Sequence, residues 1–207
     1  MKKKQISNKK PIVILGAGGH SRVLYDCLEL LKRNVLDVCE DDHDILKNYK
    51  PQKVELVMGI GSVRDTDLRR AIYLKFKNKG YDFATVIHPL ASIGSKVQMG
   101  EGVQVMAGAI IQIGSRVGDN VLINTNSVLD HDCEIGDHSH VAPGATISGG
   151  VKIGAESHIG TGASIIQGIR LGSRCLVGAG SAVVKNFPDG SILLGCPAKN
   201  CKKSQVG

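Results

Sequence analysis

A histidine between two aspartates is the strongest candidate for acid–base chemistry in the sequence. Asp130, His131 and Asp132 are consecutive. An imidazole titrates near neutral pH and can take a proton from a nucleophile, while an adjacent carboxylate can fix its tautomer and stabilise the imidazolium. Leu129 belongs to an aliphatic series that we expect to point inward, so His131, two residues later, should face outward. From these residues alone, a solvated pair in a polar turn is the alternative interpretation.

A glycine-rich turn near the N-terminus suggests a second function, the binding of phosphate. Gly16, Gly18 and Gly19 follow a short β-branched run and precede a segment with helical spacing. Such a turn presents backbone N–H groups and a helix N-terminus to an anion. The full dinucleotide fingerprint has a third glycine where this chain has Ser21, so a purely structural turn stays open as an alternative.

The elements of the first 88 residues place these groups at one edge of a sheet. Apolar runs alternate with amphipathic segments, which predicts strands at 11–15, 35–39, 54–60 and 83–87 and helices at 21–33 and 63–79. This order predicts a small parallel sheet with helices on its faces. Glu40 and Asp41 end the second strand, where a carboxylate can hold ribose hydroxyls. A Rossmann-like sheet of only half the usual size suits a nucleotide-linked sugar better than a dinucleotide.

From residue 93 a repeat of six residues runs along the chain. Sixteen successive positions at this spacing, from Ile93 to Val183, are aliphatic or Met. Such a repeat predicts a parallel β-helix, because one short strand and one turn use six residues and three units close a triangular coil. The aliphatic side chains would point inward, and the coils would stack about 4.8 Å apart. We therefore expect two domains, at residues 1–88 and 89–207.

Three histidines raise the question of a zinc site. His140 and His158 are eighteen residues apart, one coil of the expected β-helix, and His138 is close to them. The γ-class carbonic anhydrases, which are β-helical zinc enzymes, place two of their three histidine ligands five residues apart. No pair of histidines in this sequence has that spacing. We therefore expect no metal.

Composition and charge argue against several other classes of protein. The chain carries a formal charge of +7, but eight basic residues lie in the tails, at 1–10 and 199–207. The segment 11–198 has eighteen basic and nineteen acidic residues, a charge of −1. Aromatic residues make up only 3 %. These figures favour frayed, basic tails and give no reason to expect nucleic acid or a membrane as a partner.

The cysteines and the longest apolar runs bear on the compartment. No run reaches the roughly 18 apolar residues that a membrane helix needs. The six cysteines form no CxxC pair, and the short apolar run after the N-terminal lysines stops too early for an export signal. Reduced thiols in a cytoplasmic protein are the expected state.

Several motifs together resemble one family of acyltransferases. They lie at 16–20, 40–41, 59–61, 87–89, 123–133 and 195–199. The most specific is the segment that starts at Asn124-Thr125 and ends with Asp130-His131-Asp132. These motifs are similar to those of the hexapeptide-repeat sugar acyltransferases of the sialic acid O-acetyltransferase-like family. They are most similar to the nucleotide-sugar N-acetyltransferases of the bacillosamine and perosamine pathways. The resemblance implies a left-handed β-helix, a homotrimer and the use of acetyl-CoA.

The resemblance also implies roles for single residues. His131 would be the catalytic base and Asp132 its partner. Acetyl-CoA would lie along His140, Thr161 and Ala179, on successive coils. The nucleotide-sugar would contact residues of the first domain, namely Gly18, Gly19, His20, Glu40, Asp41 and Gly61.

We therefore expect a cytoplasmic, acetyl-CoA-dependent N-acetyltransferase acting on a nucleotide-linked amino-sugar in bacterial surface-glycan biosynthesis. A UDP-linked sugar with a 4-amino group is the first expectation, and a GDP-linked sugar is the alternative. His131 would assist direct attack of the amine, since Cys133, the nearest thiol, should point inward. O-acetylation of a sialic-acid-like sugar, or a non-catalytic β-helical scaffold that binds nucleotide-sugars, stays open as an alternative.

Overall fold

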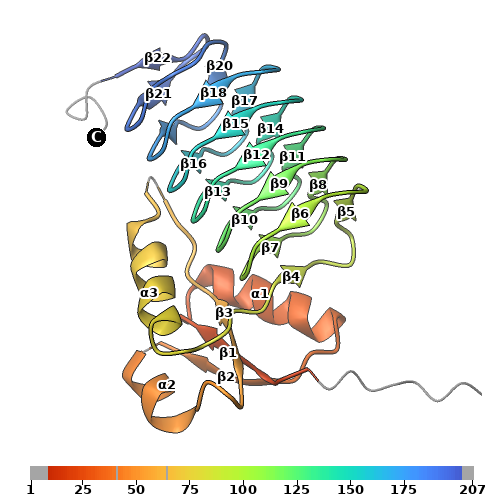
Figure 1. Ribbon diagram of the computed structural model, residues 1–207, viewed down its shortest axis with the longest axis vertical. Coiled ribbons are helices and arrows are strands. Elements are labelled where there is room, and N and C mark those ends of the chain that lie inside the picture. The colour runs from red at the N-terminus through yellow and green to blue at the C-terminus, as the bar shows by residue number, and fades with distance from the viewer. Residues whose placement is uncertain (1–8, 41, 64, 202–207) are drawn as a thin grey trace, which may run out of the picture.

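An α/β region precedes a long parallel β-solenoid, and the coils of the solenoid stack away from it (Figure 1). The computed structural model describes residues 9–40, 42–63 and 65–201, and only the backbone of residues 42–44. Most of the two predicted basic tails, and the candidate residue Asp41, lie outside the described residues. Within the described ranges, no helix is long and apolar enough to cross a membrane. The predicted fold class, a small α/β region followed by a β-helix of hexapeptide repeats, is confirmed.

The α/β region is built around a three-stranded parallel sheet in the order β2-β1-β3. Its elements are β1 (Ile12–Leu15), α1 (Gly19–Leu30), β2 (Val35–Cys39), α2 (Asp42–Asn48), β3 (Glu55–Met58) and α3 (Asp67–Lys77). Val13 and Leu15 join the apolar cluster on one face of β1, and Ile12 and Ile14 join the cluster on the other. A central parallel strand covered on both faces is uniformly apolar, which explains the run that predicted it. The helix α2 was not predicted.

One predicted strand, at 83–87, is divided in the structure. Phe83 forms only an isolated bridge to Leu56 of the small sheet, while β4 (Val86–Ile87) pairs with β7 of the solenoid. The expectation of one continuous strand is wrong, because β4 supplies the hydrogen-bond partner that the first complete coil needs. The predicted domain boundary at residue 88 stays a prediction.

The solenoid has three sheets of short strands. The eight-stranded sheet contains β4, β7 (Gln104–Val105), β10 (Leu122–Ile123), β13 (His140–Val141), β16 (His158–Ile159), β19 (Leu176–Val177), β21 (Ile192–Leu194) and β22 (Lys199–Asn200). The six-stranded sheet contains β5 (Ser92–Ile93), β8 (Ile110–Ile111), β11 (Val128–Leu129), β14 (Thr146–Ile147), β17 (Ser164–Ile165) and β20 (Ala182–Val183). The five-stranded sheet contains β6 (Gln98–Met99), β9 (Arg116–Val117), β12 (Glu134–Ile135), β15 (Lys152–Ile153) and β18 (Arg170–Leu171). All neighbours are parallel except β21 and β22.

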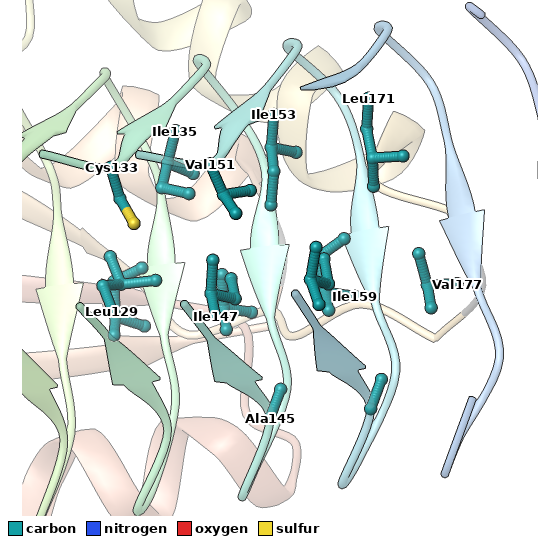
Figure 2. Close-up of a cluster of buried hydrophobic side chains, with 14 of the residues drawn as sticks. Leu129, Cys133, Ile135, Ala145, Ile147, Val151, Ile153, Ile159, Leu171 and Val177 are labelled. Atoms are coloured by element: carbon teal, nitrogen blue, oxygen red, sulfur yellow. The ribbon is translucent and has the colours of Figure 1, made fainter. Parts of the chain in front are cut away.

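In the two-residue strands from β7 to β20, the second residue points into the solenoid. Leu129, Ile147 and Ile153 are among the aliphatic side chains that fill its interior (Figure 2). Burying each such side chain stabilises the fold by about 1.5–3 kcal/mol relative to leaving it exposed. Cys133 is fully buried among them, as expected. The first residue of these strands points out of the solenoid, where its side chain can contact the α/β region or a ligand.

The corners of the coils share one backbone conformation. Every sixth residue from Lys96 to Gly180 has a positive φ, and these include Asp132 at 57°. Glycine adopts this left-handed conformation easily, and aspartate tolerates it better than most other residues. The corner geometry therefore sets the direction in which the Asp132 side chain leaves the chain.

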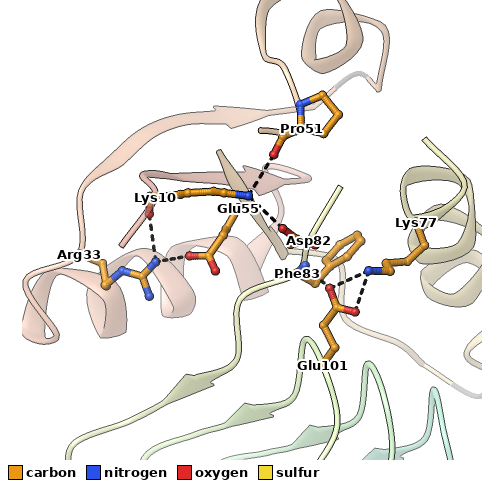
Figure 3. A network of polar contacts seen from close by, with 8 residues as sticks. All are labelled: Lys10, Arg33, Pro51, Glu55, Lys77, Asp82, Phe83 and Glu101. Atoms are coloured by element: carbon orange, nitrogen blue, oxygen red, sulfur yellow. Dashed lines mark hydrogen bonds and ion pairs between the residues drawn. The ribbon is translucent and has the colours of Figure 1, made fainter. Parts of the chain in front are cut away.

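Apolar and polar contacts hold the α/β region against the first coils. Met106 and Leu122 of the solenoid join the apolar cluster that covers one face of the small sheet. Glu101, in the first coil, accepts hydrogen bonds from the Phe83 backbone at 2.7 Å and from Lys77 of α3 at 2.9 Å (Figure 3). This junction brings the loop after β3 against strands β13 and β16.

Candidate functional site

His131 and Asp132 form a hydrogen-bonded pair on the solenoid surface. His131 Nδ1 lies 2.9 Å from Asp132 Oδ2, and the His131 backbone N–H donates to Asp130 Oδ1 at 2.8 Å. A carboxylate can only accept, so Nδ1 carries the proton and Nε2 is left as a base. The hydrogen bond that His131 donates to Asp132 raises the pKa of His131. The His131 side chain is 49 % exposed, so a nucleophile can reach Nε2.

Glycines in the neighbouring coils make room for this pair. Gly149 lies eighteen residues after His131, and a Cβ there would overlap the imidazole ring. Gly114 lies eighteen residues before Asp132, and a Cβ there would overlap the Asp132 carboxylate. The pair can therefore occupy its position only because both neighbouring coils lack a side chain at that point.

A hollow of about 490 Å³ lies where the α/β region meets the eight-stranded sheet. It is lined by residues of the α/β region and of the sheet with its following corner, namely His20, Gly61, Ser62, Val63, Leu122, Asn124, His140, Ala142, Pro143, His158 and Thr161. His131 does not line it, because it lies at the corner that follows the six-stranded sheet. Within one chain, His131 and the hollow are on different corners of the coil.

A buried arginine fixes the loop that forms one wall of the hollow. Arg69 of α3 is fully buried and donates to the backbone carbonyls of Ile60 at 2.7 Å and Met58 at 3.4 Å. Burial lowers its pKa to about 9. These contacts hold the end of β3 and the following residues, Gly61 and Ser62, in place.

His20 is held as a neutral ring in the hollow. Its Nε2 lies 2.8 Å from Gln104 Oε1, and Gln104 Nε2 donates to the Met58 carbonyl. The second contact fixes the amide so that Oε1 accepts from His20 Nε2–H, which leaves His20 Nδ1 as an acceptor. Burial lowers the pKa of His20 to about 4. His20 can therefore accept a hydrogen bond from a ligand, as its predicted binding role requires, but is too weak a base to be protonated near neutral pH.

His140 and His158 stack on adjacent coils, as their spacing predicts. They are paired in register, with ring centroids 4.9 Å apart and an angle of 89° between the rings. Ser62 Oγ lies 2.7 Å from His140 Nδ1 and 3.4 Å from His158 Nδ1. Burial lowers the pKa of both histidines, and that of His140 falls well below its usual value. Both rings are neutral at physiological pH.

The third histidine of the possible zinc set lies elsewhere. His138 Nδ1 is 3.1 Å from Asn120 Nδ2, and the His138 ring packs edge-on against Tyr73 of α3. Within the described part of the chain, no group of three histidine, cysteine or acidic side chains is placed to hold a metal ion.

The glycines of the predicted phosphate-binding turn serve two purposes. Gly16 has a φ of 91°, and a Cβ at Gly59 would overlap the Leu15 carbonyl, so both are required by the backbone. A Cβ at Gly18 or Gly19 would meet nothing within 4 Å. Gly18 caps α1 without a side-chain hydrogen bond. The first N–H groups of a helix have no partner within the helix, so those of α1 could bind a phosphate.

The remaining candidate residues are at the surface or outside the structure. Glu40 follows β2 and is exposed, and Asp41 lies outside the described residues. Thr161 is at the rim of the hollow. Ala179 is exposed on the next coil, where its backbone passes close to Gly160.

Three residues that contact the predicted histidines of the hollow, Ser62, Gln104 and His158, were not themselves predicted as site residues. Ser62 and Gln104 contact histidines that are far away in sequence, and no local pattern indicates such a contact. The sequence suggests His158 only as a possible zinc ligand. The pairing of His158 with His140 at a spacing of one coil is the signal that could have placed it in the site.

Two family models match the solenoid. The model of the bacterial transferase hexapeptide (six repeats) matches residues 114–149, and that of the hexapeptide repeat of succinyl-transferase matches residues 150–185. A comparison with curated protein sequences finds no match.

Two solved structures are similar over nearly the whole chain. One is a histidine-to-asparagine variant of perosamine N-acetyltransferase from Caulobacter crescentus, in complex with CoA and GDP-perosamine. It is 33 % identical, with 93 % of this chain and 97 % of that chain covered and a TM-score of 0.84. The other is the acetyltransferase domain of PglB from Neisseria gonorrhoeae, in complex with acetyl coenzyme A. It is 31 % identical, with 93 % of this chain and 100 % of that chain covered and a TM-score of 0.85.

Proposed function

The chain belongs to the hexapeptide-repeat family of nucleotide-sugar N-acetyltransferases, and we propose that it acetylates the amine of a nucleotide-linked amino-sugar with acetyl-CoA. The observation that carries this proposal is the His131–Asp132 pair, which leaves an imidazole Nε2 free at the surface with a raised pKa. A base of this kind is what an amine needs when it attacks a thioester.

We propose direct transfer without an acyl-enzyme. The amine nitrogen attacks the thioester carbonyl carbon, a C–N bond forms, and His131 Nε2 takes the proton that the nitrogen loses. Asp132 stabilises the resulting imidazolium. The C–S bond then breaks, and the CoA thiolate recovers the proton. Cys133 takes no part, because its thiol is buried and burial raises its pKa.

The two substrates would bind on the two sides of the hollow. The relatives in complexes with CoA, acetyl-CoA and GDP-perosamine support both ligand classes. The nucleotide would lie against the open turn at Gly18 and Gly19, with Glu40 and Asp41 near the ribose. Acetyl-CoA would run along the coils past Thr161 and Ala179. The sugar amine and the thioester would then meet between His20 and His140.

The separation of His131 from the hollow leads us to propose a homotrimer in which the site is shared. A second copy would bring its His131 to the hollow of the first. Exposed aliphatic residues lie at the same corner of other coils: Ile113, one coil before His131, is 45 % exposed, and Ile166 and Val184, two and three coils after it, are 47 % and 44 % exposed. Exposed aliphatic residues near one corner of the solenoid suit an interface between copies.

The experiment for this function offers the protein acetyl-CoA and a panel of UDP- and GDP-linked amino-sugars. Release of free thiol and a mass gain of one acetyl group on a single sugar are expected, with a UDP-linked 4-amino-sugar as the first candidate. Acetylation of a hydroxyl on a sugar without an amine would show that the protein is an O-acetyltransferase rather than an N-acetyltransferase. Binding of a nucleotide-sugar without any release of thiol would instead indicate a binding protein. The product is an activated sugar, so we place the reaction in the cytoplasm, before glycan assembly.

A further inference from the structure

A chain of hydrogen bonds in the hollow begins at an asparagine side chain. Asn124 Oδ1 accepts the Thr125 backbone N–H at 2.8 Å. This contact fixes the amide, because a flipped amide would set its NH₂ group against another donor. Asn124 Nδ2 therefore faces His140 Nε2, 3.1 Å away, and donates to it. His140 Nε2 must carry a lone pair and no proton.

The tautomer of His140 follows from this contact. A neutral imidazole with a bare Nε2 carries its proton on Nδ1. His140 Nδ1–H then donates to Ser62 Oγ at 2.7 Å. Neither nitrogen of His140 is left for a ligand in this arrangement.

The tautomer of His158 follows in turn. Ser62 Oγ has one proton, and it already accepts from His140, so its O–H can donate to His158 Nδ1 at 3.4 Å. His158 is neutral, since burial lowers its pKa. A bare Nδ1 therefore requires the proton to be on Nε2. No described residue accepts a hydrogen bond from His158 Nε2, and the His158 side chain lines the hollow.

We propose that His158 binds a carbonyl oxygen of the acyl donor through Nε2–H, a role that rests on the proposed function of the site. A neutral N–H donor suits a carbonyl, and acetyl-CoA offers the thioester carbonyl and the amide carbonyls of its pantetheine arm. His20 faces the same hollow with a bare Nδ1, which suits an N–H or O–H of the acceptor sugar. The hollow thus presents a fixed donor and a fixed acceptor to the two substrates.

The residues at the position of His158 in other strands of the eight-stranded sheet suggest a variant that should fold. Leu122 and Leu176 occupy the same outward position in β10 and β19 of the same sheet. His158→Leu therefore places an already accepted side chain at this position but removes the N–H donor. His158→Gln is the matched variant, because its amide can direct an N–H to about the same point. Arg170→Gln, on the five-stranded sheet, controls for a change elsewhere on the solenoid.

Kinetics and CoA binding distinguish the two kinds of carbonyl. If Nε2–H binds the thioester oxygen, His158→Leu should lower kcat by about 10²–10³-fold and leave CoA affinity nearly unchanged. If it binds a pantetheine amide, the variant should weaken CoA binding by about 3–10-fold. His158→Gln should recover part of either loss. Wild-type values of both kcat and CoA affinity in His158→Leu would overturn the proposal.

The tautomers can be read without turnover, on the full chain labelled with ¹⁵N. Two-bond ¹H–¹⁵N correlation spectra should show the proton on Nε2 of His158 and on Nδ1 of His140. CoA should shift the His158 Nε2 signal, and Ser62→Ala should remove the preference for one tautomer of His158. A proton on Nδ1 of His158 in the wild type would overturn the proposal. Absence of transfer to every sugar would refute the proposed function, whereas these spectra would still test His158.

Discussion

His131 is half exposed and bonded to a carboxylate, whereas His20, His140 and His158 lie in the hollow and are bonded to amide or hydroxyl groups. The carboxylate raises the pKa of His131, and burial lowers the pKa of the other three. A carboxylate stabilises the protonated ring, while an amide merely selects one neutral tautomer. One residue type is therefore placed to move a proton at the solenoid corner and to hold fixed donors and acceptors in the hollow.

The largest effect should come from removing the base. His131→Ala should lower kcat by about 10²–10⁴-fold, because the variant lacks the imidazole that would take the proton from the amine. Thiol release measured with saturating acetyl-CoA and sugar gives kcat, and sedimentation should show an unchanged oligomer. Near-normal kcat in this variant would remove His131 from the mechanism.

A smaller loss should follow from replacing its partner by the matched amide. Asp132→Asn keeps a side chain that tolerates the positive φ of this corner. It loses the charge-assisted hydrogen bond to His131 Nδ1, so kcat should fall about 10–100-fold. Because Asp132 raises the pKa of His131, the acidic limb of the pH–rate profile should move to lower pH in the variant. A limb that stays in place would mean that another group titrates in the reaction.

Protonation of the histidines in the hollow should lower the free energy of unfolding of the protein rather than shift its pH–rate profile. His20 has a pKa of about 4 in the fold, below its ordinary 6.5. As the pH falls, His20 therefore binds a proton in the unfolded chain before it does so in the folded chain. The stability that neutral His20 provides is complete above pH 6.5 and is lost as the pH falls toward 4. His20→Gln should abolish about 2 kcal/mol of the loss between pH 7 and pH 5.

Urea unfolding at the two pH values measures this difference, and His131→Ala is the control. In the wild type, His131 has a raised pKa and so adds a little stability as the pH falls. The His131→Ala variant should therefore lose as much stability on acidification as the wild type, or slightly more. An equal loss in His20→Gln and wild type would show that His20 is protonated in the fold.

The smallest effect should come from filling the space beside the His131 ring. Gly149 has an ordinary φ, so alanine there fits the backbone, but its Cβ would overlap the His131 ring. We expect a fall in kcat of about tenfold, with thermal stability nearly unchanged. Gln167→Ala, at the same corner position one coil further along, should leave kcat unchanged. Equal kcat values in Gly149→Ala and wild type would show that the ring position is not critical.

The sequence predicts the solenoid better than the junction. The six-residue spacing from Ile93 to Val183 follows directly from inward side chains in stacked coils, and it identifies the core. The Asp130-His131-Asp132 segment is local, so its pairing can be foreseen from neighbouring residues. The helix α2 and the division of the 83–87 run depend on packing between segments far apart in sequence, which no local pattern records.

The hollow illustrates the same difference. Ser62 contacts His140 across 78 residues, and Gln104 contacts His20 across 84. Both are outward or loop positions that any polar residue could occupy in an isolated strand or turn. Only the docking of the α/β region on the first coils brings them to the rings whose tautomers they select.

The sharing of each site between His131 of one copy and the hollow of another is tested most directly by mixing two defective chains. His131→Ala lacks the base, and Thr161→Trp would fill the exposed rim of the hollow. Each alone should be nearly inactive. Trimers reassembled from equal amounts of both should recover about a quarter of wild-type activity, because a quarter of the interfaces then join an intact base to an intact hollow. Activity no greater than that of the two separate variants would contradict a shared site and place the base and the hollow of one chain together.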